Sequence, residues 1–277
     1  MSTPSTTAAA PPSGGVGVRP ARPRPSPAPW LALAAVVAIT VWASLAATGI
    51  GVDLSELVRN SSNATRVLSQ LVDPHWAYWR TPIGPLVETL EMAVVATAVG
   101  ALISLPLIFL ASRVTNPYRP FVVAVRALLS VLRSVPDLLF ASLFVTIIGV
   151  GALSGILALT LFAIGIVVKL TSEVVDATDS GPIEAARSSG ATWPATDRAA
   201  VLPQILPSFA ATTLYVFELN IRASAVLGLV GAGGLGDLIN VVRKFYRYQD
   251  LSMIIIEVLV VIIVLEAASQ ALRRRLA

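Results

Sequence analysis

The chain has no cysteine among its 277 residues and only one histidine, His75. Disulfide bonds, thiolate nucleophiles and cysteine metal sites are therefore excluded, and one histidine cannot build a multi-histidine metal centre. Charged residues make up only 13% of the sequence, against about 25% in typical soluble domains. Hydrophobic residues reach 55%, and the mean hydropathy is +0.78. This balance predicts a membrane protein that crosses the bilayer several times.

The sequence also lacks a Gly-Lys-Ser or Gly-Lys-Thr phosphate loop, so it indicates no ATP site of its own. The stretch "GAGGLG" matches the G-x-G-x-x-G dinucleotide pattern through Gly231, Gly233 and Gly236. We reject nucleotide binding there because no strand is expected before these glycines and no nucleotide domain surrounds them. Two interpretations of these residues and Gly234 stay open, namely close packing of membrane helices and an interrupted, re-entrant segment.

Six apolar runs are long enough to cross a hydrocarbon core of about 30 Å. They cover residues 30–50, 86–111, 121–149, 153–176, 204–230 and 251–271. We therefore predict an all-α polytopic membrane protein with about six transmembrane helices. Residues 1–29, rich in Ser, Thr, Ala, Pro and Gly, are expected to form a disordered tail.

A mixed segment, residues 51–85, separates the first two predicted spans. It ends in "DPHWAYWRTP", whose Trp76, Tyr78 and Trp79 are typical of a boundary between membrane and water. His75 is interpreted as part of this belt.

The distribution of basic residues predicts the orientation in the membrane. With the N-terminus inside, cytoplasmic segments hold ten arginines, whereas outer segments hold five arginines and one lysine. The cytoplasmic set is Arg19, Arg22, Arg24, Arg113, Arg119, Arg187, Arg198, Arg273, Arg274 and Arg275, and the outer set is Arg59, Arg66, Arg80, Arg243, Lys244 and Arg247. Both termini are therefore expected in the cytoplasm, and residues 51–85 outside it. The net charge of +4 fits cytoplasmic loops better than nucleic-acid binding.

The polar insert "GPIEAARSSGATWPATDRAAVLPQ" is predicted to lie on the cytoplasmic side. Its first helix is expected over 182–189, with Ser180 or Gly181 as N-cap. Gly190 is suited to the left-handed conformation that commonly ends a helix, and a second short helix is expected over 192–202. Because isolated helices of two turns are unstable in water, the insert needs something to pack against. Its own spans and another protein are both possible supports.

The insert resembles the EAA loop of ABC importer permeases. The resemblance is carried by three groups of residues. Glu184, Ala185 and Ala186 come first, Gly190 follows after three intervening residues, and Leu202 and Pro203 follow after eleven more intervening residues. Ala200 departs from the isoleucine that the family usually has, without shifting the spacing. Residues 88–112, 128–145 and 211–239 are similar to permeases of phosphonate importers, within the methionine-importer-like group. The resemblance covers residues 80–277.

This resemblance implies the type I importer permease fold, with a permease core over 86–277 and a cytoplasmic coupling loop over 177–203. It implies a subunit of the bacterial inner membrane that pairs with a second copy, two ABC ATPases and an extracytoplasmic substrate-binding protein. ATP and Mg²⁺ would bind to the ATPases, so no catalytic residue, cofactor or metal site is expected in this chain. Phosphonate, phosphite or phosphate is the expected cargo. A related importer for methionine or another small solute, and an ATPase-independent transporter or channel, remain alternatives.

Ionisable residues within spans are costly and are therefore candidates for function. Arg126, Ser130, Arg133 and Asp137 are spaced to lie on one face of a single helix, which Pro136 is expected to kink. Arg126 is near enough to the cytoplasmic surface to snorkel, so Arg133 is the stronger candidate for a translocation pathway.

Two further pairs have the i, i+4 spacing of an intrahelical ion pair, Glu218 with Arg222 and Lys169 with Glu173. Lys169 and Glu173 lie near the predicted cytoplasmic end of a span, so snorkelling or a local pair is favoured over a role in transport. Arg133 and Arg222 have the side chain best suited to contact an oxyanion at two points. An equally weighted alternative is that Asp137 and Glu218 neutralise these two arginines in structural ion pairs.

Overall fold

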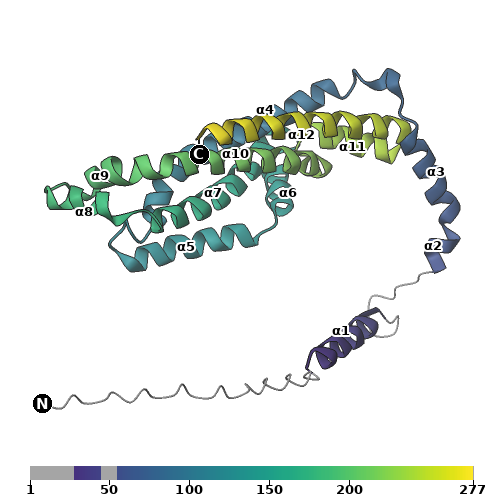
Figure 1. Cartoon of the computed structure of the whole chain (residues 1–277). Coiled ribbons are helices and arrows are strands. Elements are labelled where there is room, and N and C mark those ends of the chain that lie inside the picture. Colours follow the sequence, from purple (N-terminus) through teal and green to yellow (C-terminus); the bar gives the residue numbers. More distant parts are fainter. Residues whose placement is uncertain (1–27, 45–54, 277) are drawn as a thin grey trace, which may run out of the picture. The chain divides into compact units, whose positions relative to one another are not determined.

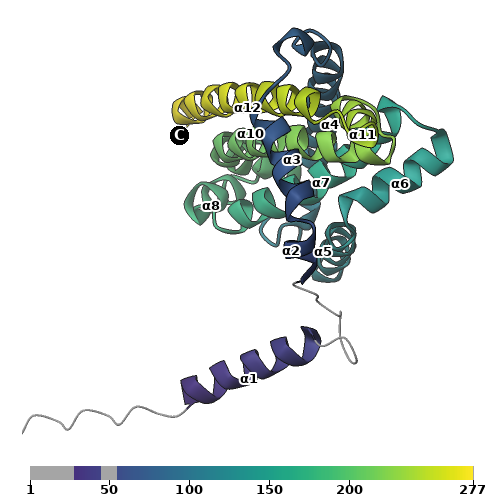
Figure 2. The same cartoon turned by 90° about the vertical axis from the view of Figure 1, so that its right-hand side faces the viewer.

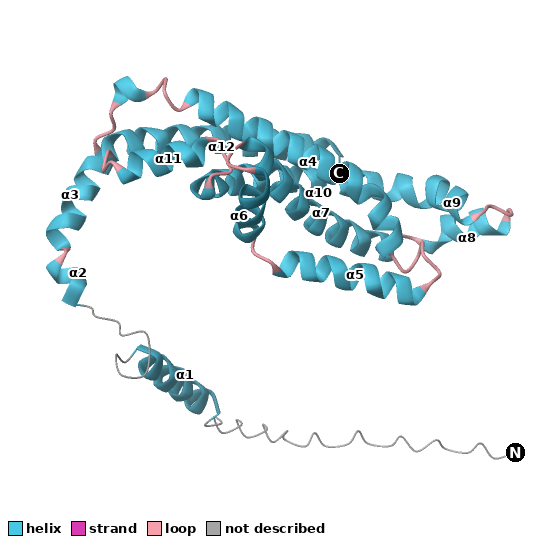
Figure 3. Cartoon of the chain, turned by 180° about the vertical axis from the view of Figure 1, so that it is seen from behind, coloured by secondary structure: helices cyan, strands magenta, loops and turns pink. Residues whose placement is uncertain are grey.

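The computed structural model describes residues 28–44 and 55–276, which form helices joined by short loops (Figure 3). The chain divides into two compact units, residues 1–61 and 62–277. The first unit contains α1 (Ala28–Ser44) and α2 (Ser55–Arg59). α1 accounts for most of the predicted first span, whose residues 45–50 lie outside the described residues. The predicted disordered tail also lies outside them, apart from the start of α1.

The second unit begins within α3 and contains the remaining helices (Figure 1). In chain order they are α3 (Ser61–Val72), η1 (Trp76–Tyr78), α4 (Ile83–Ala111), α5 (Arg119–Ser134), α6 (Asp137–Ile148), α7 (Ala152–Asp176), α8 (Ser180–Ser188), α9 (Trp193–Thr196), η2 (Asp197–Val201), α10 (Leu202–Leu227), η3 (Gly228–Val230), α11 (Leu235–Lys244) and α12 (Tyr248–Leu276).

Four helical stretches in the described residues are long and apolar enough to span a membrane: Ile83–Ala111, Ala152–Asp176, Trp193–Val230 and Tyr248–Arg274. They correspond to the second, fourth, fifth and sixth predicted spans. The prediction of one helix over 121–149 is wrong, because α5 and α6 are separate helices that meet at an angle of 84°. Pro136 has no N–H for a helical hydrogen bond, and it holds Val135 in an extended conformation (φ −83°, ψ 124°).

α7 is the central helix of the second unit, and it packs against α4, α5, α6 and α10 (Figures 1 and 2). Small residues allow these helices to approach closely. A Cβ atom added to Gly100 of α4 would lie 2.7 Å from the Cβ of Ala163 on α7, so this crossing requires glycine. Val167 and Val168 of α7 are completely buried and belong to the largest apolar core.

The sequence did not predict α11, and it placed the end of the last helix too early. α11 is short and amphipathic, with Asp237, Arg243 and Lys244 among its ten residues, so it lacks the long apolar run by which the spans were identified. α12 continues past residue 271 through the three arginines at 273–275. Arginine is a good helix former, and the helix therefore need not stop where the apolar run stops.

Candidate functional site

The insert between α7 and α10 folds into the two expected short helices joined at Gly190. Asp179, rather than Ser180 or Gly181, caps α8, because its Oδ1 accepts a hydrogen bond from the N–H of Gly181 at 3.0 Å. Gly190 adopts the expected left-handed conformation, with φ at +86°. α9 follows, and a π-helical stretch, η2, leads directly into α10. We name α8, α9, η2 and their connections (residues 179–201) the elbow.

The inner face of the elbow is anchored in the main apolar core. Ile183 is 3% exposed and Val201 is fully buried, and both pack in the same cluster as Ile205 of α10. Ala200, which stands where the resembled family has isoleucine, is also buried in this cluster. The support predicted for these short helices is therefore provided, on this face, by the protein's own spans.

The outer face of the elbow is unoccupied by other parts of the second unit. Glu184 and Ala185 are exposed, and Glu184 makes no hydrogen bond or ion pair with any described residue. Trp193 is 43% exposed. One face of α8 is thus fixed to the spans, while the face that carries the Glu-Ala sequence is open.

Arg187 holds the two arms of the elbow together. Its guanidinium lies 4.1 Å from the ring centroid of Trp193 on α9, which is a cation–π contact. The same guanidinium donates a hydrogen bond through Nη2 to the carbonyl oxygen of Val114 at 3.2 Å, in the loop between α4 and α5. The elbow therefore contacts a third part of the fold besides α7 and α10, to which its ends are joined.

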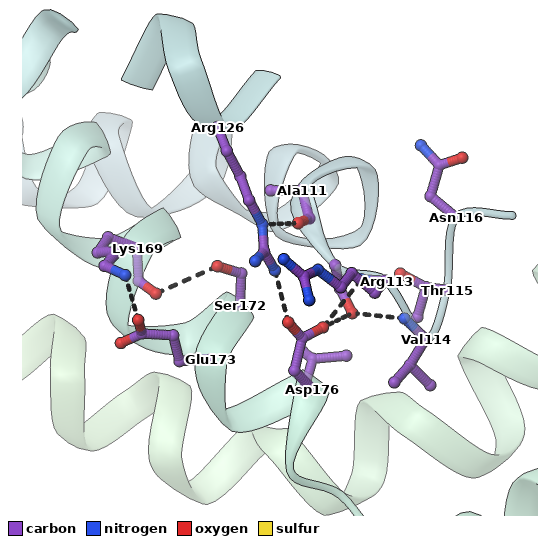
Figure 4. A network of polar contacts seen from close by, with 12 residues as sticks. Ala111, Arg113, Val114, Thr115, Asn116, Arg126, Lys169, Ser172, Glu173 and Asp176 are labelled. Atoms are coloured by element: carbon purple, nitrogen blue, oxygen red, sulfur yellow. Dashed lines mark hydrogen bonds and ion pairs between the residues drawn. The ribbon is translucent and has the colours of Figure 1, made fainter. Parts of the chain in front are cut away.

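Asp176, the last residue of α7, joins this helix to the C-terminal end of α4 and to the middle of α5, immediately before the elbow (Figure 4). Its Oδ1 accepts hydrogen bonds from Ser112 Oγ at 2.7 Å and from the N–H of Arg113 at 2.9 Å. Its Oδ2 is 2.5 Å from Nη2 of Arg126 on α5, and Nε of Arg126 donates to the carbonyl oxygen of Ala111. The side chain of Arg126, predicted to snorkel to the surface, is 32% exposed, and its charge is paired with Asp176.

Of the two interpretations of Lys169 and Glu173, the local pair is confirmed. Nζ of Lys169 donates a hydrogen bond to Oε1 of Glu173, one helical turn away (Figure 4). Both side chains are about half exposed, so the pair is a surface ion pair rather than a buried one.

The predicted single face of Arg126, Ser130, Arg133 and Asp137 is wrong at its last member. The first three lie on α5, whereas Asp137 begins α6 beyond the break, where its Oδ1 accepts a hydrogen bond from the N–H of Leu138. Arg133 therefore does not pair with Asp137. Among the described residues, its one polar contact is a hydrogen bond from Nη1 to the carbonyl oxygen of Gly165 on α7, at 3.3 Å.

The predicted intrahelical pair of Glu218 and Arg222 is also wrong, because both side chains pair with α12. Oε1 of Glu218 lies 2.7 Å from Nη2 of Arg273, and Arg222 lies 3.5 Å from Glu266. The Glu218 side chain is only 9% exposed, whereas those of Arg222 and Glu266 are more than 40% exposed. α10 and α12 are therefore joined by one buried and one exposed ion pair.

α10 is also joined to α4, by a buried hydrogen bond. Asn220 is fully buried and donates from Nδ2 to Oγ1 of Thr97 at 2.8 Å. Its Oδ1 has no hydrogen-bond partner among the described residues. Three polar residues of α10 thus point to two neighbours, Glu218 and Arg222 to α12 and Asn220 to α4.

The glycines of "GAGGLG" form the turn between η3 and α11. Gly231, Gly233 and Gly234 have φ between +69° and +90°, which side chains with a Cβ rarely adopt. Gly236 has a different role, since a Cβ added there would lie 2.1 Å from the carbonyl oxygen of Ala225. The turn therefore combines the two interpretations that the sequence left open, an interrupted chain and a close packing contact.

His75 lies in a polar cluster at the start of α12. Its Nδ1 is 2.7 Å from Oδ1 of Asp250, whose Oδ2 is 2.5 Å from Arg247. Its ring also stacks on that of Tyr78, with centroids 6.3 Å apart. Burial raises the pKa of Tyr78, a shift that the nearby Arg247 guanidinium partly opposes. His75 thus has a specific polar partner besides the predicted aromatic belt.

Sequence reasoning missed Asp176, Glu266 and Arg273 as partners of the predicted residues. Glu266 and Arg273 are seven residues apart, so they share a face of α12, as Glu218 and Arg222 share a face of α10 at a spacing of four. An acidic and a basic residue on one face of each helix was the signal available in the sequence. Asp176 carried a weaker one, as the second of two acidic residues, after Glu173, at the end of α7.

The chain matches a known protein family over residues 104–277, described as "Binding-protein-dependent transport system inner membrane component". It is 38% identical to the phosphite transport system permease protein PtxC of Stutzerimonas stutzeri, over 80% of this chain and 81% of that protein. It is 40% identical to the phosphate-import permease protein PhnE of Mycolicibacterium smegmatis, over 79% of this chain but only 41% of that longer protein.

The fold is similar to that of a solved chain of the MetNI methionine ABC transporter in an inward-facing conformation. The TM-score is 0.64, the identity is 24%, and the match covers 71% of this chain and 96% of the solved one. At this identity the similarity concerns the fold alone. It agrees with the predicted type I importer permease architecture.

Proposed function

The chain belongs to the family of binding-protein-dependent transport system inner membrane components, and we propose that it imports phosphite, phosphonate or phosphate as the permease of an ATP-driven transporter. The named relatives carry phosphite and phosphate transport in their descriptions, at 38% and 40% identity. These identities, against 31% to a probable D-methionine transport permease of Vibrio cholerae over 68% of this chain, support an oxyanion cargo over methionine.

In this proposal, ATP is hydrolysed on separate subunits. The sequence has no phosphate loop, and the elbow offers an open face to a partner. Two copies of this chain would assemble with two ATPases, and an extracytoplasmic binding protein would deliver the cargo. The ten arginines on the predicted inner side support cytoplasmic termini and a cytoplasmic elbow.

One observation carries the coupling mechanism: the elbow is fixed to the spans on one face and open on the other. Ile183 and Val201 are buried in the core, while Glu184 and Ala185 are exposed. A partner docked on the open face would move the elbow as a lever, and its ends continue into α7 and α10. Rigid-body motion of these helices would alternate access between the two sides of the membrane.

Uptake into proteoliposomes tests the proposal. The chain is reconstituted with its ATPase and binding protein, and uptake of labelled phosphite and phosphate is measured with and without ATP. Methylphosphonate and methionine serve as competitors. We expect ATP-dependent uptake that phosphite or methylphosphonate competes and methionine does not. Competition by methionine alone would move the chain to the methionine importers, and undiminished uptake without the ATPase would refute the ATP-driven mechanism.

A further inference from the structure

A polar cavity of about 180 Å³ lies between the second half of α5 and the C-terminal half of α7, the helix that leads into the elbow. Its lining consists of Ala111, Arg126, Leu129, Ser130, Arg133, Lys169, Ser172 and Glu173. Five of these residues, Ala111, Arg126, Lys169, Ser172 and Glu173, are seen with the Asp176 contacts in Figure 4. A water molecule occupies about 30 Å³ in the liquid, so the cavity has room for a tetrahedral oxyanion with several waters.

The charges around this cavity do not cancel. Three of its lining side chains are cationic, and two of them have anionic partners, Arg126 with Asp176 and Lys169 with Glu173. Arg133 is different, because it makes no ion pair with any described residue. The cavity therefore carries one uncompensated positive charge.

The position of Arg133 along the helix makes this charge unusual. Arg133 is fourteen residues beyond Arg119, the first residue of α5, which corresponds to about 21 Å along a helix axis. It contacts Gly165, which lies near the middle of the 25-residue helix α7. A cation without a counterion at this depth is costly, and such residues typically mark pathways for ions or polar substrates.

We propose that this cavity binds a tetrahedral phosphorus oxyanion, with Arg133 as its principal ligand. The guanidinium can donate two parallel hydrogen bonds to two oxygens of one anion, and within the described residues it donates one hydrogen bond, the 3.3 Å contact to Gly165. Lys169 supplies a second cation from the facing helix. The identity of this anion as transported cargo rests on the proposed function, and the cavity would then be a stopping point on the route through the membrane.

Cysteine protection tests binding directly, and the absence of native cysteine makes a single-cysteine variant simple to prepare. Ser130 lines the cavity and is exposed, so Ser130→Cys reports on its occupancy. Modification by the small neutral reagent methyl methanethiosulfonate is followed by the intact mass of this chain in the full transporter complex. We expect phosphite or phosphate at ten times its dissociation constant to slow modification about tenfold, since only the empty cavity reacts.

Three second-site variants assign this protection to Arg133. Arg133→Gln should weaken phosphite protection by about tenfold to a hundredfold in apparent affinity, because a charge-assisted contact is lost. Arg133→Lys should retain part of it. Arg119→Gln removes the same charge from the same helix outside the cavity, and it should leave protection unchanged.

Gly165→Ala provides an independent test that keeps the charge. A Cβ at this position would lie 2.9 Å from Cγ of Arg133, so the arginine side chain must move. Protection should weaken here too. The Gly165→Ala variant by itself decides the role of Arg133 if Arg133→Gln fails to assemble.

The outcomes separate this inference from the proposed function. Full protection in both Arg133→Gln and Gly165→Ala overturns the assignment of Arg133. Absence of protection in the Ser130→Cys parent, in a complex that still imports phosphite, overturns the cavity and leaves the proposed function intact. Protection in a complex that imports neither phosphite nor phosphate supports the anion site and refutes the proposed cargo.

Discussion

Replacement of Asp176 is the sharpest test of how the elbow is joined to the spans. This carboxylate accepts three hydrogen bonds, from Ser112, Arg113 and Arg126, at 2.5 to 2.9 Å. Removing it leaves all three donors unsatisfied. A hydrogen bond to a charged group contributes about 1.5 to 3 kcal/mol, but water reaches the Asp176 and Arg126 side chains, which are 25% and 32% exposed. We therefore expect Asp176→Ala to lower the free energy of unfolding by about 2 to 4 kcal/mol.

A double-mutant cycle isolates the ion pair from the other contacts. Asp176→Asn retains an acceptor for Ser112 and Arg113 but lacks the negative charge that faces Arg126. Combined with Arg126→Gln, it should show an interaction energy of about 1 to 2 kcal/mol, measured by unfolding in mixed micelles. The equivalent cycle for Lys169 and Glu173 is the control, and this exposed pair should contribute about 0.5 kcal/mol or less.

The same variants test whether the Asp176 junction transmits motion from the elbow to the spans. Asp176 connects the ends of α4 and α7 and the middle of α5 next to the elbow, so a loosened junction should lower the amount of cargo imported per ATP hydrolysed. Basal ATP hydrolysis by the partner subunits should continue. Additive effects of Asp176→Asn and Arg126→Gln, within about 0.5 kcal/mol, together with normal coupling, would refute this account.

Three further substitutions have defined outcomes. Gly190→Val strains the backbone, because a β-branched residue rarely adopts φ +86°, but it causes no clash, because no atom lies within 4 Å. We therefore expect normal membrane insertion but impaired coupling of ATP hydrolysis to uptake. Wild-type coupling would exclude the lever mechanism. Glu218→Gln should lower the apparent melting temperature more than Arg222→Gln, because only the first leaves a mostly buried cation without its partner; the reverse order would contradict this. Gly236→Ala should destabilise by about 1 to 3 kcal/mol or more through a backbone clash, whereas Gly84→Ala, with open space around it, should be nearly neutral in thermal unfolding.

Several features of the fold and the candidate site were predictable from the sequence because they depend on neighbours along the chain. Long apolar runs identify spans, since each must cover the thickness of the hydrocarbon core by itself. The left-handed Gly190 and the pair of Lys169 with Glu173 are similarly local, and the structure confirms both. The two short helices of the elbow follow from the same kind of pattern.

Tertiary structure alone decided which charges meet. The i, i+4 spacing of Glu218 and Arg222 permits an intrahelical pair, but α12 brings Arg273 and Glu266 close enough to take both partners. Helical periodicity also placed Asp137 beside Arg133, and the 84° bend at Pro136 separates their helices. Sequence spacing measures proximity only within one unbroken helix. It therefore could not show that Arg133 lacks a counterion, which depends on what the neighbouring helices place within its reach.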